Sequence, residues 1–170
     1  MSEFKNKNVL ITGGASGIGK IMGRMALEKG AANLIIWDVN PDGMESARAE
    51  LSERGNVHCY RVNVSDENEI AAAYERVKED VGCVDILINN AGVVRGNSTF
   101  DRQKVSDIRF TMDVNATAPM LVALEMLPDM MQRNSGHICN IASAAGMLGV
   151  PKLSVYCASK WAVVGWTESL

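Results

Sequence analysis

Short, continuously apolar runs alternate with longer amphipathic stretches along the whole chain. A run that is apolar at every position, rather than at every second one, is typical of a strand covered on both faces. The predicted strands cover residues 8–12, 34–38, 57–64, 84–88 and 137–143. The intervening stretches have apolar residues at helical spacing, and they predict helices over residues 17–29, 41–54, 66–81 and 102–133, with a further one over 154–170.

Capping residues mark several of these boundaries. Asn40 precedes Pro41, which suits the first position of a helix, and Ser65 precedes two acidic residues in the first turn of the next helix. Gly30 and Gly82 follow predicted helices, where a left-handed glycine commonly ends the last turn. Strands that alternate with helices at this spacing predict βαβ units with right-handed crossovers. The expected fold class is α/β, with five strands in a doubly wound parallel sheet.

Composition narrows the range of functions. The chain has 170 residues, so we expect residues 1–170 to form a single domain. The net charge of −3 gives no basic excess, and no nucleic-acid partner is therefore expected. No stretch of about twenty apolar residues occurs, so we expect no membrane span and a cytoplasmic protein with reduced thiols. Four widely spaced cysteines and two histidines predict no metal site.

A glycine-rich turn joins the first predicted strand to the first predicted helix, with the sequence TGGASGIG over residues 12–19. Glycines at such a turn allow a tight bend and let a pyrophosphate approach the N–H groups at the helix N-terminus. The helix dipole favours the negative charge there. A Rossmann-type dinucleotide site is therefore predicted, although an ordinary glycine-rich turn is the alternative. Its expected cofactor residues are Gly13, Ser16, Gly17, Ile18 and Gly19.

An acidic residue stands at the expected distance from this turn. Asp38 ends the second predicted strand, about twenty residues after Gly19, as expected for a ribose-binding carboxylate. A carboxylate there accepts hydrogen bonds from the ribose hydroxyls and repels a 2′-phosphate. No basic residue stands at Ser16 or Val39 to bind that phosphate. The predicted cofactor is NAD, with NADP disfavoured.

Further motifs follow in order along the chain. They are Asn89-Asn90-Ala91-Gly92 after the fourth predicted strand, Asn115 in the long helix, and Ser143 followed by Tyr156 and Lys160. With the glycine turn, they make the chain resemble the short-chain dehydrogenase/reductase family over residues 12–160. The resemblance implies that Ser143, Tyr156, Lys160 and Asn115 are catalytic. It also implies further cofactor contacts by Asn63, Val64, Asn90, Ala91 and Gly92, and by Tyr156 and Lys160.

Asn63 departs from the family pattern, which often has Asp at this position. The side-chain oxygen of an asparagine can still accept a hydrogen bond from the adenine amino group.

Tyr156 and Lys160 also have a chemical argument of their own. They are four residues apart on a predicted helix and therefore share one face. Oxidising an alcohol with NAD removes a hydride from carbon and a proton from oxygen, so the protein has to supply a base. An ammonium group one turn away stabilises a phenolate, which allows Tyr156 to be that base. Ser143, at the end of the fifth predicted strand, can bond to the substrate oxygen.

Asn115 has a separate argument, because Pro119 follows it by four residues in the long helix. Proline has no N–H, so the carbonyl of Asn115 is expected to lose its helical partner and to bind a water molecule. In the family that the chain resembles, this water links the lysine to solvent. A simple proline kink is the alternative.

Within this family, the sequences at residues 37–40 and 141–170 look most like retinol and hydroxysteroid dehydrogenases. The expected activity is NAD-dependent hydride transfer between nicotinamide and a hydrophobic alcohol or ketone, with a retinoid-, steroid- or lipid-like substrate. Family members extend beyond the position of Leu170, so we expect the C-terminal part of the family fold to be absent and the natural protein to be a longer homodimer or homotetramer. The alternatives are a non-catalytic NAD-binding subunit and, less favoured, a methyltransferase.

Overall fold

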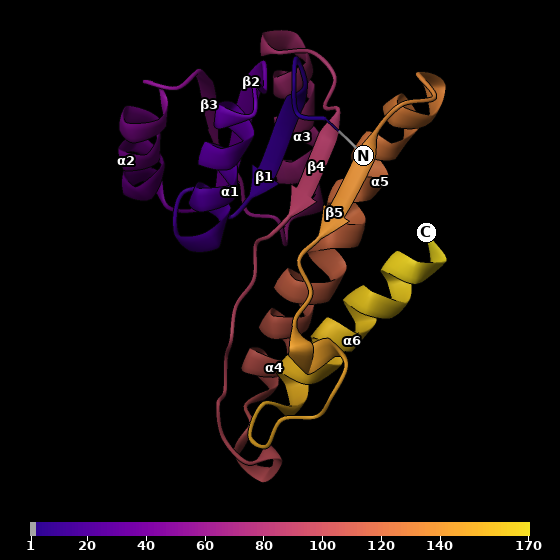
Figure 1. The fold of residues 1–170 in the computed structure, drawn as a ribbon. Coiled ribbons are helices and arrows are strands. Elements are labelled where there is room, and N and C mark those ends of the chain that lie inside the picture. The colour runs from indigo at the N-terminus through magenta and orange to yellow at the C-terminus, as the bar shows by residue number, and fades with distance from the viewer. Residues whose placement is uncertain (1–2) are drawn as a thin grey trace.

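The structure is a computed structural model that describes residues 3–170. Its central element is a five-stranded sheet in the order β3-β2-β1-β4-β5, and every neighbouring pair is parallel (Figure 1). The strands are β1 (Asn8–Thr12), β2 (Asn33–Asp38), β3 (Asn56–Arg61), β4 (Ile86–Asn89) and β5 (His137–Asn140). The predicted α/β class and parallel five-stranded sheet are confirmed.

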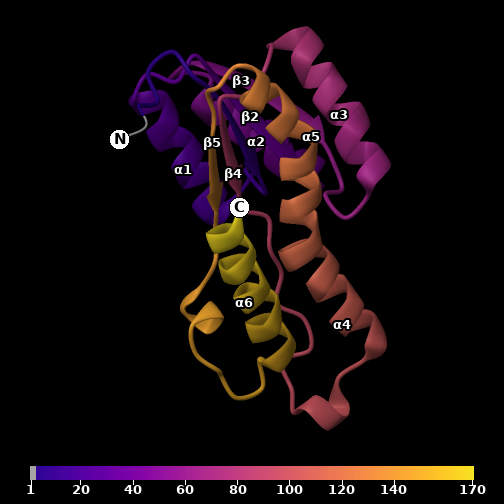
Figure 2. The same cartoon turned by 90° about the vertical axis from the view of Figure 1, so that its right-hand side faces the viewer.

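Helices cover both faces of this sheet, as a doubly wound fold requires. In Figure 2, α1 lies on one side of the strands, and α3 and α5 lie on the other. The helices are α1 (Gly17–Glu28), α2 (Pro41–Leu51), α3 (Glu67–Asp80), α4 (Val105–Met112), α5 (Ala118–Gln132) and α6 (Ser154–Ser169). Among residues 3–170, no helix has the length and apolarity needed to cross a membrane.

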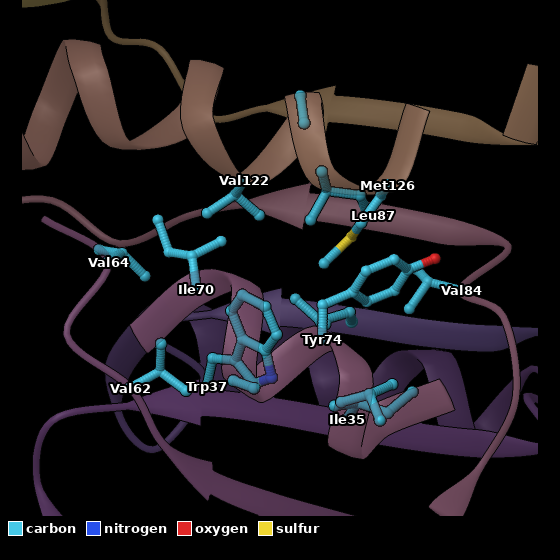
Figure 3. Packing of buried hydrophobic residues seen from close by; sticks show 14 of the residues in the cluster. Ile35, Trp37, Val62, Val64, Ile70, Tyr74, Val84, Leu87, Val122 and Met126 are labelled. Atoms are coloured by element: carbon cyan, nitrogen blue, oxygen red, sulfur yellow. The ribbon is translucent and has the colours of Figure 1, made fainter. Parts of the chain in front are cut away.

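Each face of the sheet has its own apolar core, because successive side chains of a strand point to opposite faces. On one face, Ile35 and Trp37 pack with Tyr74 of α3 and Met126 of α5 (Figure 3). On the other face, Ile11 and its neighbours in β2 pack with α1 and α2. Both sets of strand residues are buried, which explains why the strands are apolar at consecutive positions.

The order of the strands defines where a ligand can bind. Because β1 lies between β2 and β4, the chain winds away from β1 in both directions. The loops after these strands therefore diverge and leave a crevice at the carboxyl edge of the sheet. Beyond this edge, α6 packs against α4 and the turn that joins α4 to α5 (Figure 1). The predicted site residues lie at or just beyond the carboxyl ends of all five strands, or in α6 and the turn that joins α4 to α5.

The largest differences from the predicted boundaries concern β3, β5 and the long helix. β3 ends at Arg61 rather than at residue 64, although Val62 and Val64 remain buried in the core. Likewise β5 ends at Asn140, so Ser143 lies in the following loop. An apolar pattern records burial, and loop residues that pack on the core extend that pattern beyond the hydrogen-bonded strand. The predicted long helix is divided by a π-helical turn, Asp113–Thr117, between α4 and α5.

Helix α3 corrects one capping assignment. Its N-cap is Asp66, not Ser65, and the Asp66 carboxylate accepts hydrogen bonds from Asn68 N at 2.9 Å and Glu69 N at 3.2 Å. A carboxylate gains more than a hydroxyl here because it also interacts with the helix dipole. The predicted cap of α2 is confirmed, since Asn40 Oδ1 accepts from Gly43 N at 3.1 Å.

Candidate functional site

A cavity of about 680 Å³ opens at the carboxyl edge of the sheet. This volume suits a small-molecule cofactor. Every predicted cofactor residue outside α6 lines it: Gly13, Ser16, Gly17, Ile18, Gly19, Asp38, Asn63, Val64, Asn90, Ala91 and Gly92. The structure therefore brings together, in one cleft, residues that the sequence places in four separate segments.

The glycine turn forms one wall of the cleft by its main-chain shape. Gly13 and Gly17 have φ values of +63° and +51°, a backbone region that residues with a Cβ rarely adopt. A Cβ at Gly19 would collide with the Gly13 carbonyl oxygen and lie 2.6 Å from Asn90 Nδ2. Within residues 3–170, the Ser16 side chain makes no capping hydrogen bond to α1. The first N–H groups of α1 are thus left for an anionic ligand.

Thr12 and Asn90 fasten the glycine turn to the end of β4. Thr12 is 2% exposed, and its hydroxyl accepts from Asn90 N at 3.0 Å and from Ala91 N at 3.1 Å. In return, Asn90 Nδ2 donates to the carbonyls of Thr12 at 3.0 Å and Gly13 at 3.1 Å. Thr12 is not among the site residues predicted from the sequence. Its position as a polar residue that ends an apolar strand was the available signal.

Asp38 is held by main-chain donors. Its Oδ2 accepts from Ala15 N at 3.1 Å, and its Oδ1 accepts from Asn40 N at 3.0 Å. These two bonds fix the direction of the carboxylate at the end of β2. Each oxygen retains acceptor capacity, so the carboxylate can still receive ligand hydroxyls.

The far end of the cleft lies beyond β3. Asn63 Oδ1 accepts from Ser65 N at 3.1 Å, and Asn63 N donates to Glu69 Oε2 at 2.8 Å. Arg61 and Phe110 also line the cavity, and the sequence analysis did not anticipate either of them. The charge of Arg61 next to the end of an apolar strand was the one sequence signal for its position.

Asn115 organises the opposite end of the site from within the π-helical turn. It is 1% exposed, and its amide makes a two-way contact with Val93, accepting from Val93 N and donating to Val93 O, each at 2.8 Å. It also donates to Ser159 Oγ at 3.1 Å, and Ser159 Oγ donates to Tyr156 O at 2.7 Å. Asn115 therefore joins the loop after β4 to α6. Ser159 was missed by the sequence analysis.

The predicted helical irregularity near Pro119 takes the form of this π turn. The N–H of Ala118 donates to the carbonyl of Asp113, five residues earlier, instead of to the residue four earlier. A single π turn inside a helix is often found at a functional site.

Lys160 is buried beside these groups. It is 5% exposed, and its Nζ donates to the carbonyl oxygen of Ile141 at 2.7 Å. The Nζ atom lies 5.9 Å from the centre of the Tyr156 ring, one helical turn away on α6. Burial lowers the pKa of the Lys160 ammonium group. A Cβ at Gly92 would lie 3.5 Å from Asn115 Oδ1 and 3.8 Å from Lys160 Nζ, so these three residues meet.

Ser143 lies in the loop after β5. Its Oγ accepts from Ala145 N at 3.2 Å and caps a short 3₁₀ turn, Ala144–Gly146, that packs against α6. Since the hydroxyl oxygen is the acceptor in that bond, its hydrogen is left to donate elsewhere.

Other reactive side chains have no comparable setting. Burial raises the pKa of the Cys59 and Cys139 thiols, which makes them poorer nucleophiles. Among residues 3–170, no group of three or more His, Cys, Asp and Glu side chains is placed to hold a metal ion.

Comparison with known proteins gives the same picture. The family model for short chain dehydrogenases matches residues 7–170. Estradiol 17-beta-dehydrogenase 11 of Pongo abelii is 40% identical over 163 residues, which cover 95% of this chain and 54% of that protein. Epidermal retinol dehydrogenase 2 of Mus musculus is 39% identical over 164 residues, covering 95% of this chain and 52% of that protein.

The fold is also similar to that of a solved structure. The crystal structure of NAD⁺-bound xylitol dehydrogenase matches with a TM-score of 0.94 and 28% identity, covering 99% of this chain and 65% of that one. This chain spans about half the length of the curated relatives it matches. The glycine turn, the Asn90 segment and the Tyr156–Lys160 helix all lie within the matched region, and the chain belongs to the short-chain dehydrogenase family.

Proposed function

We propose that this chain carries the site of an NAD-dependent oxidoreductase. The reaction is hydride transfer between nicotinamide and the carbinol or carbonyl carbon of a hydrophobic alcohol or ketone. The observation that carries the proposal is the meeting of Gly92, Asn115 and Lys160 at the end of a dinucleotide-sized cleft, with Tyr156 one turn from Lys160.

The cleft residues fit a nicotinamide dinucleotide. The free N–H groups at the start of α1 suit the pyrophosphate, and Gly17, where an added Cβ would meet no protein atom within 4 Å, lines the cleft beside them. The fixed Asp38 carboxylate suits the adenosine ribose hydroxyls, and this contact favours NAD over NADP. When bound, the cofactor supplies the carbon atom that accepts or gives the hydride.

Tyr156 takes the proton in alcohol oxidation. Its phenolate accepts the proton of the substrate hydroxyl, which leaves the electrons of the C–H bond free to depart as hydride. The Lys160 ammonium stabilises the phenolate across one helical turn. Because Lys160 is buried, burial opposes its charge, and a phenolate beside it relieves that penalty.

Ser143 orients the substrate. Its Oγ already accepts a hydrogen bond from Ala145 N, so its own hydrogen can donate to the substrate oxygen. Asn115 acts as a positioning residue, since it holds the Val93 segment and Ser159 on α6 in fixed relation.

The loops that follow β4 and β5 support an apolar substrate. Val94 follows the Asn115-bound segment, and Met147 and Leu148 follow the Ser143 turn, and all three are exposed. Exposed apolar side chains in one region suit an apolar ligand. Two relatives whose names refer to estradiol and retinol, both hydrophobic alcohols, support the same substrate class.

Assembly into a homodimer or homotetramer is part of the proposal. Leu124 on α5 and Trp161 on α6 are large apolar side chains that remain exposed. Light scattering across a concentration series tests this point, and a monomer at all concentrations would contradict it.

The activity is tested by following NADH formation with retinol, estradiol and xylitol as alcohols. We expect turnover with the hydrophobic alcohols, slower turnover with xylitol, and faster reaction with NAD than with NADP. Saturable NAD binding with no turnover on any of these alcohols, or on the corresponding ketones, would favour a non-catalytic NAD-binding subunit instead.

A further inference from the structure

Three charged side chains line the adenosine end of the cleft, and only two of them are engaged by the protein. Asp38 accepts from the N–H groups of Ala15 and Asn40, and Glu69 accepts from the N–H group of Asn63. Both carboxylates are therefore directed by main-chain donors. The third charged group, the Arg61 guanidinium, is not.

Arg61 is exposed at the carboxyl end of β3 and lines the cavity. Within residues 3–170, its guanidinium has no hydrogen bond, ion pair or ring contact. It stands in register with Asp38 on the neighbouring strand β2. Tyr60 and Val62, on either side of it, point into the core beneath α3, so Arg61 is directed to the opposite face, on the side of α1 and α2.

This position predicts the kind of ligand atom that Arg61 meets. On the proposed function, the pyrophosphate lies at the N-terminus of α1 and the adenosine ribose lies against Asp38. One strand further on, the guanidinium of Arg61 lines the cleft without a partner in the described part of the chain and is therefore available to an anionic group of the ligand. In a nicotinamide dinucleotide, the anion at the adenosine end is the 2′-phosphate of NADP. Arginine suits a phosphate because its planar donors bind two oxygens at once.

We propose that Arg61 is a specificity-determining residue that binds the 2′-phosphate of NADP, so that the cleft accepts NADP as well as NAD. Asp38 and Arg61 then act in opposite directions. Repulsion by Asp38 favours NAD, whereas attraction by Arg61 limits that preference. This inference rests on the proposed dinucleotide site and adds a second cofactor to it.

The test uses the adenosine halves of the two cofactors, so that it does not depend on catalysis. Calorimetric titrations of 5′-AMP, 2′,5′-ADP, NAD and NADP are compared for the parent protein, Arg61→Gln, Asp38→Ala and the exposed control Arg102→Gln. Thermal unfolding confirms that each variant is folded.

We expect Arg61→Gln to weaken 2′,5′-ADP and NADP by about tenfold or more, the range for a charge-assisted hydrogen bond. Binding of 5′-AMP and NAD should change less than about twofold, since neither has the 2′-phosphate. Asp38→Ala should shift binding in the opposite direction, in favour of NADP, and Arg102→Gln should change nothing.

The alternative is that the guanidinium stacks on the adenine ring. Stacking would make Arg61→Gln weaken all four ligands equally, and that result overturns the inference, as does an unchanged affinity for 2′,5′-ADP. A parent protein that binds 5′-AMP and NAD but not 2′,5′-ADP also overturns it, while leaving the proposed function intact. A parent that binds none of the four contradicts both.

Discussion

In the glycine turn, main-chain atoms set the shape of the cleft. In the catalytic corner, by which we mean the region around Asn115, Tyr156 and Lys160, buried side chains hold separate segments together. Gly19 belongs to the first region, where a single added methyl group would collide with the Gly13 carbonyl and with Asn90. Asn115 belongs to the second, where one amide bonds to Val93 and to Ser159.

The two regions therefore differ in the kind of substitution that each tolerates. The turn is sensitive to added volume, because Gly19 lies so close to the Gly13 carbonyl and to Asn90 that a Cβ does not fit. The corner is sensitive to removed polarity, because its buried donors and acceptors would be left without partners. On the proposed function, the chemistry takes place in the catalytic corner, so changes there should affect turnover more than cofactor binding. The following predictions are ordered by the size of the expected effect.

Replacing Tyr156 by Phe should lower turnover by about 10²–10⁴-fold, because the variant lacks the general base. Cofactor affinity should be nearly unchanged, since the residues that line the cleft are left intact. Steady-state kinetics with a hydrophobic alcohol, together with NAD titration, measures both. Tyr74→Phe is the matched control, because its hydroxyl bonds to Asp129 at 2.7 Å, on the side of the sheet covered by α3 and α5. A Tyr156→Phe variant that retains most of the turnover would refute the assignment.

Replacing Gly19 by Ala should disrupt the cofactor half. The added Cβ forces the turn to move, which should cost about 1–3 kcal/mol in the free energy of unfolding. NAD affinity should fall with it, since the same atoms form the phosphate cradle. Chemical denaturation and calorimetry give the two values.

Gly165→Ala in α6 is the control for this change. A Cβ at Gly165 meets no atom within 4 Å, so the substitution should be neutral or stabilise the helix by up to about 1 kcal/mol. Equal effects at Gly19 and Gly165 would mean that the close approach at Gly19 is not a constraint.

Replacing Asn115 by Ala should lower the free energy of unfolding by about 1–3 kcal/mol, because the N–H and carbonyl of Val93 lose their buried partner. Turnover should fall more than NAD affinity does, since the Val93 segment and α6 border the catalytic corner. The exposed Asn68→Ala on α3 should stay within about 0.5 kcal/mol of the parent. An Asn115→Ala variant as stable and as active as the parent would show that Asn115 does not position the Val93 segment and α6.

The pKa of Lys160 gives the smallest effect, measured without cofactor. Burial lowers the pKa of this group in the folded protein below the ordinary lysine value of 10.5. Between the lowered value and 10.5, the unfolded chain binds more protons than the folded one, so stability should rise with pH across that window.

The rise should be missing in Lys160→Met, which has no group that titrates at this position. Denaturation of the parent and the variant at a series of alkaline pH values measures the difference, with exposed Lys5→Met as control. A difference between parent and Lys160→Met that does not change with pH would show that burial does not oppose the charge.

Elements that depend on neighbouring residues in the chain could be predicted from the sequence. β1 matches its predicted range, and Asn40, Gly30 and Gly82 occupy the predicted caps. The glycine turn was predictable because glycine spacing and the following helix are both local features. The grouping of the cofactor residues then followed from the parallel sheet, which gathers strand ends at one edge.

The features that could not be predicted depend on contacts between segments that are distant in the sequence. Thr12, Ser159 and Arg61 are ordinary residues until the fold places them beside Asn90, Asn115 and the cleft. The early end of β3 was hidden because Val64 is buried by packing rather than by strand pairing. Pro119 indicated an irregular helix, but its π-helical form was not predictable, since a kink satisfies the same sequence.

The central claim, that the cleft binds NAD along the glycine turn with its reactive end at Tyr156 and Lys160, is tested most directly by hydrogen exchange of the protein with and without NAD. The account predicts saturable protection of amides at residues 13–19 and 90–93 and in the first turns of α6, with little change in α2 and the outer face of α3. Protection confined to other elements, or no NAD-dependent change at saturating concentration, would contradict it.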